Sequence, residues 1–270
     1  MLEKNENKTR STDRRRLQAF GEPDAGVRIN ALGQPIGPAI SDRFPRPLPD
    51  DEPLKGRHCT LSRLDPDRHA ASLFEAFAKD KSGRNWTYLP YGPFDALEDF
   101  SAWLHSQAAV QDPHFYTISN SEGKPVGMAS YLRIDPHQAT IEVGHIHFSL
   151  SMQRTKVATE AMYLMMRNAF ESLGYRRYEW KCDSLNAPSR AAAERLGFTF
   201  EGIFRKASHY KGRSRDSAWF SIVDDEWPLR KDALEAWLAC ENFDSDGKRI
   251  EGLQAIRDRL ARLESEGTGA

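Results

Sequence analysis

The stretch that decides the fold is ATIEVGHIHFSLSMQRTKVATEAM, residues 139–162. Its first part alternates apolar and polar side chains, as a strand does, and its last part opens a long apolar run, ATEAMYLMMRNAFESLG, with helical spacing. The segment SMQRTK between them predicts a loop. A strand that leads through a loop into a helix points the N–H groups and the positive end of that helix at one spot, which suits a pyrophosphate.

The segments before this stretch predict strands at HCTLSRL, HFYTISN and KPVGMASYLRI and helices at DPDRHAASLFEAFAK and DALEDFSAWLHSQAAV. Asp65 and Asp95 are able to cap the two helices. After it we expect a strand at RRYEWKCD, a helix at NAPSRAAAERLGF, and a strand pair at FTFEGIFRKASHY and DSAWFSIVDDEW. Gly174 and Gly197 are placed to end the helices before them. The order indicates an α/β fold with a sheet of mixed direction.

Three parts are expected along the chain. Residues 1–54 are polar and rich in Pro and Gly, which predicts an N-terminal arm that is partly disordered. Residues 55–227 carry the alternating strands and helices and form the main domain. Residues 228–270 predict a C-terminal helical extension, which either covers a pocket or joins two subunits, so a homodimer is possible.

Charge and cysteine content narrow the function. The chain has 38 Lys and Arg against 39 Asp and Glu, so no overall field attracts nucleic acid or a membrane, despite Arg176, Arg177 and the KGRSR turn. Cys59, Cys182 and Cys240 are odd in number and far apart, which argues against disulfides and zinc sites. No apolar run is long enough to span a bilayer. We expect a cytoplasmic protein.

Four segments together resemble the GNAT superfamily of acyl-CoA N-acyltransferases, especially its ribosomal-protein alanine N-acetyltransferase branch. They are IEVGHIHF, QRTKVATEAM, NAPSRAAAERLGF, and EGIFRK followed by DSAWFSI, and the similarity spans residues 56–227. The resemblance implies a mostly antiparallel sheet of six or seven strands, flanked by helices and splayed between its fourth and fifth strands. It also implies acetyl-CoA as cosubstrate, no metal, and an amine of a small molecule or peptide as acceptor.

The family's loop pattern, R/Q-x-x-G-x-G/A, falls on residues 153–158. Lys156 stands at the first glycine, so the loop replaces backbone freedom with a cation. The alternative is that Arg154 and Lys156 are ordinary solvated charges. By resemblance, the cofactor-binding residues are Phe148, Ser149, Leu150, Gln153, Arg154, Thr155, Lys156, Val157, Ala158, Thr159, Asn186 and Ser189.

Glu142 matches the family's E-x-G position and is the candidate general base, since an amine must lose a proton before it attacks a thioester. The alternative is a strand carboxylate paired with a neighbouring Arg. His145 and His147 lie on the same strand, where alternation places Glu142 on one face and the histidines on the other. A β-bulge would bring them together.

Ser189 matches the serine that contacts the CoA sulfur in the ribosomal-protein branch, and Asn186 the asparagine that binds pantetheine. The tyrosine used by many family members is replaced by Ala193. A plain helix entry, with Asn186 as cap, explains NAPS equally well. Cys182 as a covalent nucleophile is disfavoured, because it lies in an apolar strand without an activating neighbour.

The aromatic segment WTYLPYGPF borders the acceptor pocket by resemblance, which makes Trp86, Tyr88 and Tyr91, with His145 and His147, the candidate substrate-binding residues. The alternative is that these rings belong to the core. A second reading of the whole chain, in which a GNAT fold binds CoA as a sensor or scaffold without turnover, stays open.

Overall fold

The computed structural model describes residues 27–40 and 42–267. The chain divides into two units, Met1–Arg43 and Phe44–Ala270. In the first, β1 (Arg28–Ile29) and β2 (Pro35–Ile36) form a small antiparallel hairpin. The disordered beginning that we expect for the arm falls on residues 1–26, which lie outside the described residues.

The second unit contains one sheet and its flanking helices. Its strands are β3 (Leu54–Lys55), β4 (Cys59–Arg63), β5 (His114–Asn120), β6 (Pro125–Asp135), β7 (Thr140–Phe148), β8 (Arg177–Asp183), β9 (Thr199–Tyr210) and β10 (Arg213–Val223). Its α-helices are α2 (Pro66–Phe77), α3 (Leu97–Ala108), α4 (Lys156–Arg167), α5 (Ala187–Leu196), α6 (Trp227–Leu238) and α7 (Leu253–Gly267). Short helical turns lie at Arg84–Trp86, Asn168–Ser172, Asp224–Glu226 and Cys240–Asn242.

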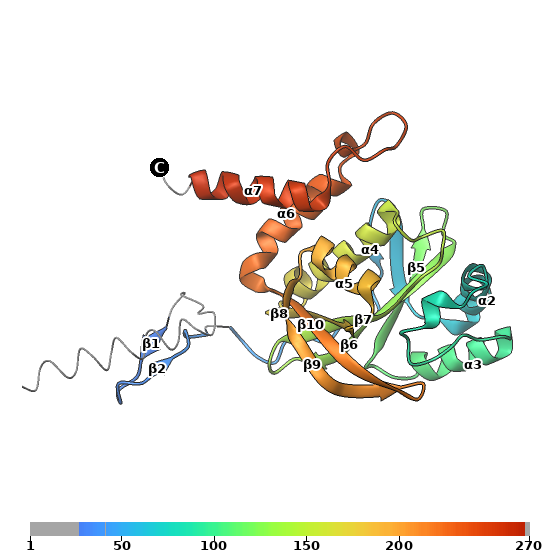
Figure 1. Cartoon of the computed structure of the whole chain (residues 1–270), viewed down its shortest axis with the longest axis horizontal. Coiled ribbons are helices and arrows are strands. Elements are labelled where there is room, and N and C mark those ends of the chain that lie inside the picture. The colour runs from blue at the N-terminus through green and yellow to red at the C-terminus, as the bar shows by residue number, and fades with distance from the viewer. Residues whose placement is uncertain (1–26, 41, 268–270) are drawn as a thin grey trace, which may run out of the picture. The chain divides into compact units, whose positions relative to one another are not determined.

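The sheet has eight strands in the order β3-β4-β5-β6-β7-β8-β10-β9 (Figure 1). Every neighbouring pair is antiparallel except β7 and β8, which are parallel. The α/β fold and the mostly antiparallel sheet that we predicted are confirmed. The strand beyond the expected six or seven is β3, whose two residues are too short to show alternation in the sequence.

Side-chain caps mark where α2, α4 and α5 begin. Asp65 accepts a hydrogen bond from Arg68 N at the start of α2, as predicted, and Gly197 ends α5 with a φ of 102°. Thr155 caps α4 by accepting from Ala158 N. The cap predicted at Asp95 is wrong, because α3 begins after Ala96, which makes no side-chain cap.

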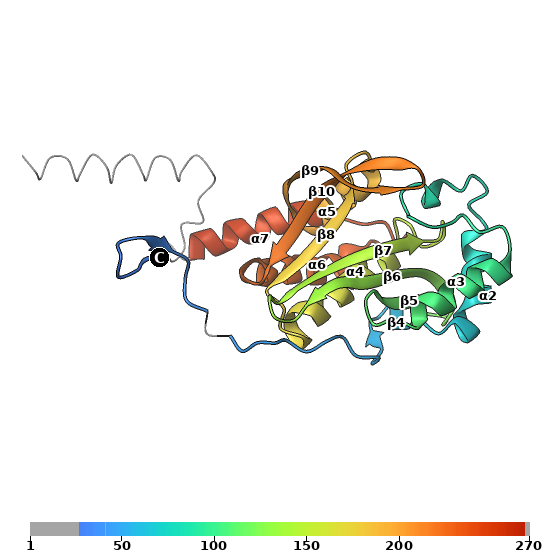
Figure 2. The ribbon, with the colours of Figure 1, turned by 90° about the horizontal axis from the view of Figure 1, so that it is seen from below.

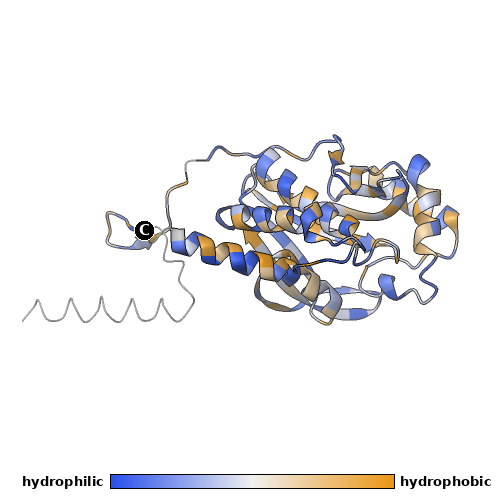
Figure 3. Ribbon diagram, turned by 90° about the horizontal axis from the view of Figure 1, so that it is seen from above, coloured by the Kyte–Doolittle hydropathy of each residue, from blue (hydrophilic) through white to orange (hydrophobic). Residues whose placement is uncertain are grey.

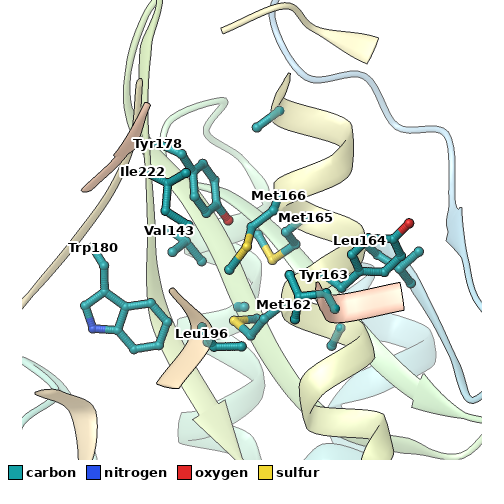
Figure 4. Packing of buried hydrophobic residues seen from close by; sticks show 14 of the residues in the cluster. Val143, Met162, Tyr163, Leu164, Met165, Met166, Tyr178, Trp180, Leu196 and Ile222 are labelled. Atoms are coloured by element: carbon teal, nitrogen blue, oxygen red, sulfur yellow. The ribbon is translucent and has the colours of Figure 1, made fainter. Parts of the chain in front are cut away.

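Helices cover both faces of the sheet, as Figure 2 shows from below. On one face α4 packs against the centre of the sheet, and its apolar side chains meet those of β7, β8 and β10 (Figure 4). On the other face α2 and α3 pack over β5 and β6, where Phe77, Phe100, Phe115 and Met128 form a second cluster. The two clusters hold the central strand β7 between them.

The C-terminal helices join the larger of these clusters. Trp227, Leu234 and Trp237 of α6 and Ile256 of α7 are all buried in it. Helix α7 alternates hydrophobic and hydrophilic residues along its length (Figure 3). The extension is therefore packed against the main domain by its apolar side.

Candidate active site

The central feature of the sheet is a fork between β7 and β8. Thr140–Val143 pairs with Arg177–Trp180, and both strands then continue, β7 to Phe148 and β8 to Asp183. The predicted splay of the fourth and fifth main strands is thereby confirmed. Because the two strands are parallel, their carboxyl ends meet at the same end of the sheet.

Each arm of the fork leads into a helix. Strand β7 reaches α4 through residues 149–155, and β8 reaches α5 through residues 184–186. Both helix N-termini therefore lie at the open end of the fork, where their partial positive charges add. No acceptor in the described part of the chain approaches the N–H groups of Lys156 and Val157, at the start of α4. Such donors suit a diphosphate.

The loop before α4 is held by its own hydrogen bonds. Met152 N and Gln153 N donate to Ser149 O, and the Gln153 side chain donates to Phe148 O at 3.0 Å. Ser149 is buried and its hydroxyl lies 3.0 Å from that of Ser151. Leu150 is half exposed. These bonds fix the loop without a glycine.

Arg154, and not Lys156, takes the unusual backbone conformation in this loop. Its φ is 61°, whereas Lys156 starts α4 with helical geometry. The lysine in place of the family glycine therefore costs no backbone strain. Its ammonium lies 3.4 Å from the centre of the Phe243 ring. Thr159, one turn later, accepts a hydrogen bond from Arg195.

The other arm of the fork positions Asn186 and Ser189. Asn186 caps α5 by accepting from Ser189 N, and the indole Nε1 of Trp180 donates to Ser189 Oγ at 3.0 Å. Ala193 is fully buried in the core, so its position holds no room for the tyrosine of other family members. The helix-entry reading of NAPS and a role for Ser189 are both compatible with this geometry.

A bulge in β7 decides which side chains share a face. The register shifts between the pairs Ser130–Gly144 and Met128–His147, so β7 holds one extra residue, and His145 has a φ of 51°. His147 faces Met128 across the ladder and Glu142 faces Leu132. Since residues 128 and 132 share a face, Glu142 and His147 do too. The bulge that we considered is confirmed.

Glu142 is held in an ion-pair cluster. It is 1% exposed, accepts two hydrogen bonds from the Arg133 guanidinium, and lies 2.9 Å from Lys181 Nζ. Lys181 also pairs with Glu179 at 2.7 Å and sits over the Trp219 ring. The reading of Glu142 as a carboxylate paired with a neighbouring Arg is therefore correct. Both oxygens of the carboxylate thus contact a cation.

Both strand histidines are neutral at pH 7. Burial lowers the pKa of His147 to about 3, and its ring packs 4.1 Å from Phe77 and 3.9 Å from Trp86. Burial, helped by the charge of Arg133, lowers the pKa of His145 to about 4. The hydroxyl of Tyr91 lies 3.1 Å from His145 Nδ1. The imidazoles of His145 and His147 are thus uncharged where they border the β7–β8 fork, on the face of the sheet that α2 and α3 cover.

Hydrogen bonds connect the aromatic segment, residues 86–94, to the chain after β8 and at the tip of β9 and β10. Trp86 is 5% exposed and belongs to the core cluster under α2, while Tyr88 donates to Leu185 O after β8. Lys211 and Arg213, at the β9–β10 tip, donate to Trp86 O at 2.8 Å and Thr87 O at 2.6 Å. Trp86 therefore forms a wall of the core, and Tyr88 and Tyr91 are the half-buried members of the predicted set.

The residues that the structure describes give little support to a cysteine nucleophile or to a metal site. Burial raises the pKa of the Cys182 thiol and that of Cys59, so neither is an activated nucleophile. No group of three potential metal ligands is found in residues 27–40 and 42–267. Within the same ranges, no helix is both long and apolar enough to cross a bilayer.

Sequence reasoning missed Arg133, Lys181 and Trp180. Arg133 reaches Glu142 through a bulge in β6, where its own φ is 48°. Lys181 could have been found, because YEWKC alternates apolar with charged side chains and so indicates a charged face on β8. The hydrogen bond of Trp180 to Ser189 depends on how α5 packs, which no local pattern shows.

Comparison with known proteins agrees with this geometry. Residues 58–199 match the family model of the acetyltransferase (GNAT) domain. The crystal structure of a GCN5-related N-acetyltransferase from Brucella melitensis is 43% identical, with a TM-score of 0.79, over 81% of this chain and 100% of that one. An uncharacterised N-acetyltransferase, YnaD of Bacillus subtilis, is 26% identical over 52% of this chain and 81% of its own length. The ribosomal-protein-serine acetyltransferase of Escherichia coli is 23% identical over 59% of this chain and 90% of its own.

Proposed function

The chain belongs to the GNAT family of acetyltransferases, and we propose that it transfers an acetyl group from acetyl-CoA to a primary amine of a small molecule or peptide. The observation that supports this best is the fork, with two helix N-termini at its open end and free N–H donors at the start of α4. An elongated thioester carrier with a diphosphate matches that arrangement.

Backbone and loop residues bind the carrier in this proposal. The part of β7 beyond Val143 offers its edge to the pantetheine amides as an added strand would. The segment 153–159 receives the diphosphate, and Asn186 binds the pantetheine arm from the β8 side. Tyr88, Tyr91 and His145 border the acceptor.

Glu142 takes the proton of the attacking amine, directly or through a water. The nitrogen–carbon bond forms, the carbon–sulfur bond of the thioester breaks, and the electron pair leaves with sulfur. Ser189 donates a hydrogen bond to the departing thiolate. Neutral His145 and His147 add no positive charge that would repel a protonated amine.

A second function is favoured by one observation, the pairing of Glu142 with both Arg133 and Lys181. Both carboxylate oxygens are then engaged by cations, and the fold would serve as a CoA-binding sensor or scaffold. Thiol release from acetyl-CoA separates the two. Release above amine-free hydrolysis with at least one of a panel of small amines and N-terminal peptides supports transfer, and none above hydrolysis supports the sensor.

A further inference from the structure

Trp180 occupies the branching point of the fork. It is the last residue of β8 that pairs with β7, opposite Val143, and it is 5% exposed. Its ring packs edge-on against Phe198, 5.6 Å between centroids. In Figure 4 the indole nitrogen lies on the edge of the ring that faces away from Met162 and Met166. That nitrogen donates to Ser189 Oγ.

The contact with Trp180 restricts what the Ser189 hydroxyl can do. A hydroxyl has one proton to donate and two lone pairs, whereas an indole N–H only donates. Ser189 Oγ is therefore the acceptor in this bond, and its own proton must point elsewhere. The serine proton is therefore left to be donated to an acceptor other than the indole.

From this geometry we infer that Trp180 is a positioning residue, which holds Ser189 as a hydrogen-bond donor toward the sulfur that leaves the thioester. The inference rests on the proposed function. The departing thiolate is an anion, so a hydrogen bond that the Ser189 hydroxyl donates to it is charge-assisted. Ser189 keeps its proton, and the proton lost by the amine goes to Glu142.

The kinetic test compares Trp180→Phe with Ser189→Ala and with the double variant. Phenylalanine keeps an aromatic ring against Phe198 and removes the donor together with part of the indole's volume, a loss of volume that the control below shares. We expect each single variant to lower kcat about tenfold, with the KM for acetyl-CoA within about twofold, because a hydrogen bond to an anion is lost. The double variant should be no slower than Ser189→Ala.

Trp237→Phe is the matched control. Trp237 is as buried as Trp180, but its indole nitrogen has no hydrogen-bond partner among the described residues. The same substitution there should leave kcat unchanged. Rate losses that multiply in the double variant, or an effect of Trp180→Phe no larger than that of the control, would overturn the inference.

A binding measurement separates this inference from the proposed function. At alkaline pH, where part of the CoA thiol is ionised, the wild type should bind CoA more tightly than desulfo-CoA, which lacks the sulfur. Calorimetry should show this preference abolished in Ser189→Ala and reduced in Trp180→Phe. If no amine is acetylated but this pattern holds, acetyl transfer fails as the function, while the placement of Ser189 by Trp180 at the CoA sulfur stands. A preference that survives both substitutions overturns the inference.

Discussion

For Glu142 the sequence predicted the position of the residue but not its ion-pair partners. Its place in E-x-G predicted a carboxylate on the central strand, and the structure puts it there, next to the fork. Its partners were not predictable in the same way. Arg133 reaches it only because β6 bulges at that residue, and Lys181 lies on a strand that follows a whole helix later.

Glu142→Gln should lower kcat about 100-fold or more, because a general base typically contributes that much, and should leave acetyl-CoA affinity unchanged. It should also lower the free energy of unfolding by about 1–3 kcal/mol, since Lys181 loses a partner while the more exposed Arg133 is solvated. Steady-state kinetics and urea unfolding measure both.

Glu179→Gln is the control for this substitution. Glu179 pairs with Lys181 as Glu142 does, and it also binds Arg177. Its loss should cost similar stability and little activity. If both variants lose activity in proportion to stability, Glu142 has only a structural role.

Lys156 belongs to the start of α4, and its cation should strengthen diphosphate binding there although the ammonium rests on Phe243. Lys156→Ala should weaken acetyl-CoA binding about two- to fivefold in calorimetry, the effect of one charge at a helix end. Phe243→Leu removes the ring and keeps the cation, so its affinity should not fall. An affinity of Lys156→Ala equal to the parent's would contradict this role.

At the scale of helices and strands, the sequence predicted those boundaries that nearby residues mark. Asp65 and Gly197 mark the ends of α2 and α5 correctly, because a cap involves residues a few positions apart. Asp95 fails as a cap since α3 begins one residue later than the sequence suggests. The bulge at His145 depends on pairing with β6, so alternation alone placed His147 on the face opposite Glu142, and the structure shows them on the same face.

The β9–β10 tip should control the aromatic segment, because Lys211 and Arg213 bind its backbone carbonyls. Replacing both with Met should loosen residues 84–94 and raise the KM for the amine, while affinity for acetyl-CoA stays the same. Hydrogen exchange should become faster in that segment. Arg205→Met, on the exposed part of β9, serves as control. Unchanged hydrogen exchange and an unchanged KM in the double variant would show that the hydrogen bonds of Lys211 and Arg213 do not control this segment.

In the described part of the chain, burial lowers the pKa of four histidines, His69, His114, His145 and His147. In the unfolded chain they titrate near their ordinary value, so the unfolded state binds more protons as pH falls below about 6.5. The free energy of unfolding is therefore expected to decrease between about pH 6.5 and pH 4, before most carboxylates are protonated.

His147→Phe should reduce this pH dependence. It removes one titrating group from an aromatic environment that accepts a ring, so the slope should fall by about 1.4 kcal/mol per pH unit in that range. Urea unfolding at several pH values measures the slope. His137→Phe, an exposed position, should leave it as in the wild type. An unchanged slope in His147→Phe would mean that this histidine is already protonated or accessible in the folded chain.

The packing of the C-terminal helices is also a property of the whole chain. Their sequence predicted helices, but the burial of Trp237 and Ile256 in the same cluster as α4 results from contacts between segments far apart. No local pattern carries that information. The resemblance predicted the splay and the loop, and the side-chain partners had to come from the structure.

Calorimetric titration with acetyl-CoA, followed by hydrogen exchange on the complex, tests most directly whether the β7–β8 fork holds the thioester carrier. One molecule should bind per chain, and protection should appear in residues 144–159 and 186–190. No heat at millimolar acetyl-CoA, or protection confined to other segments, would contradict the account.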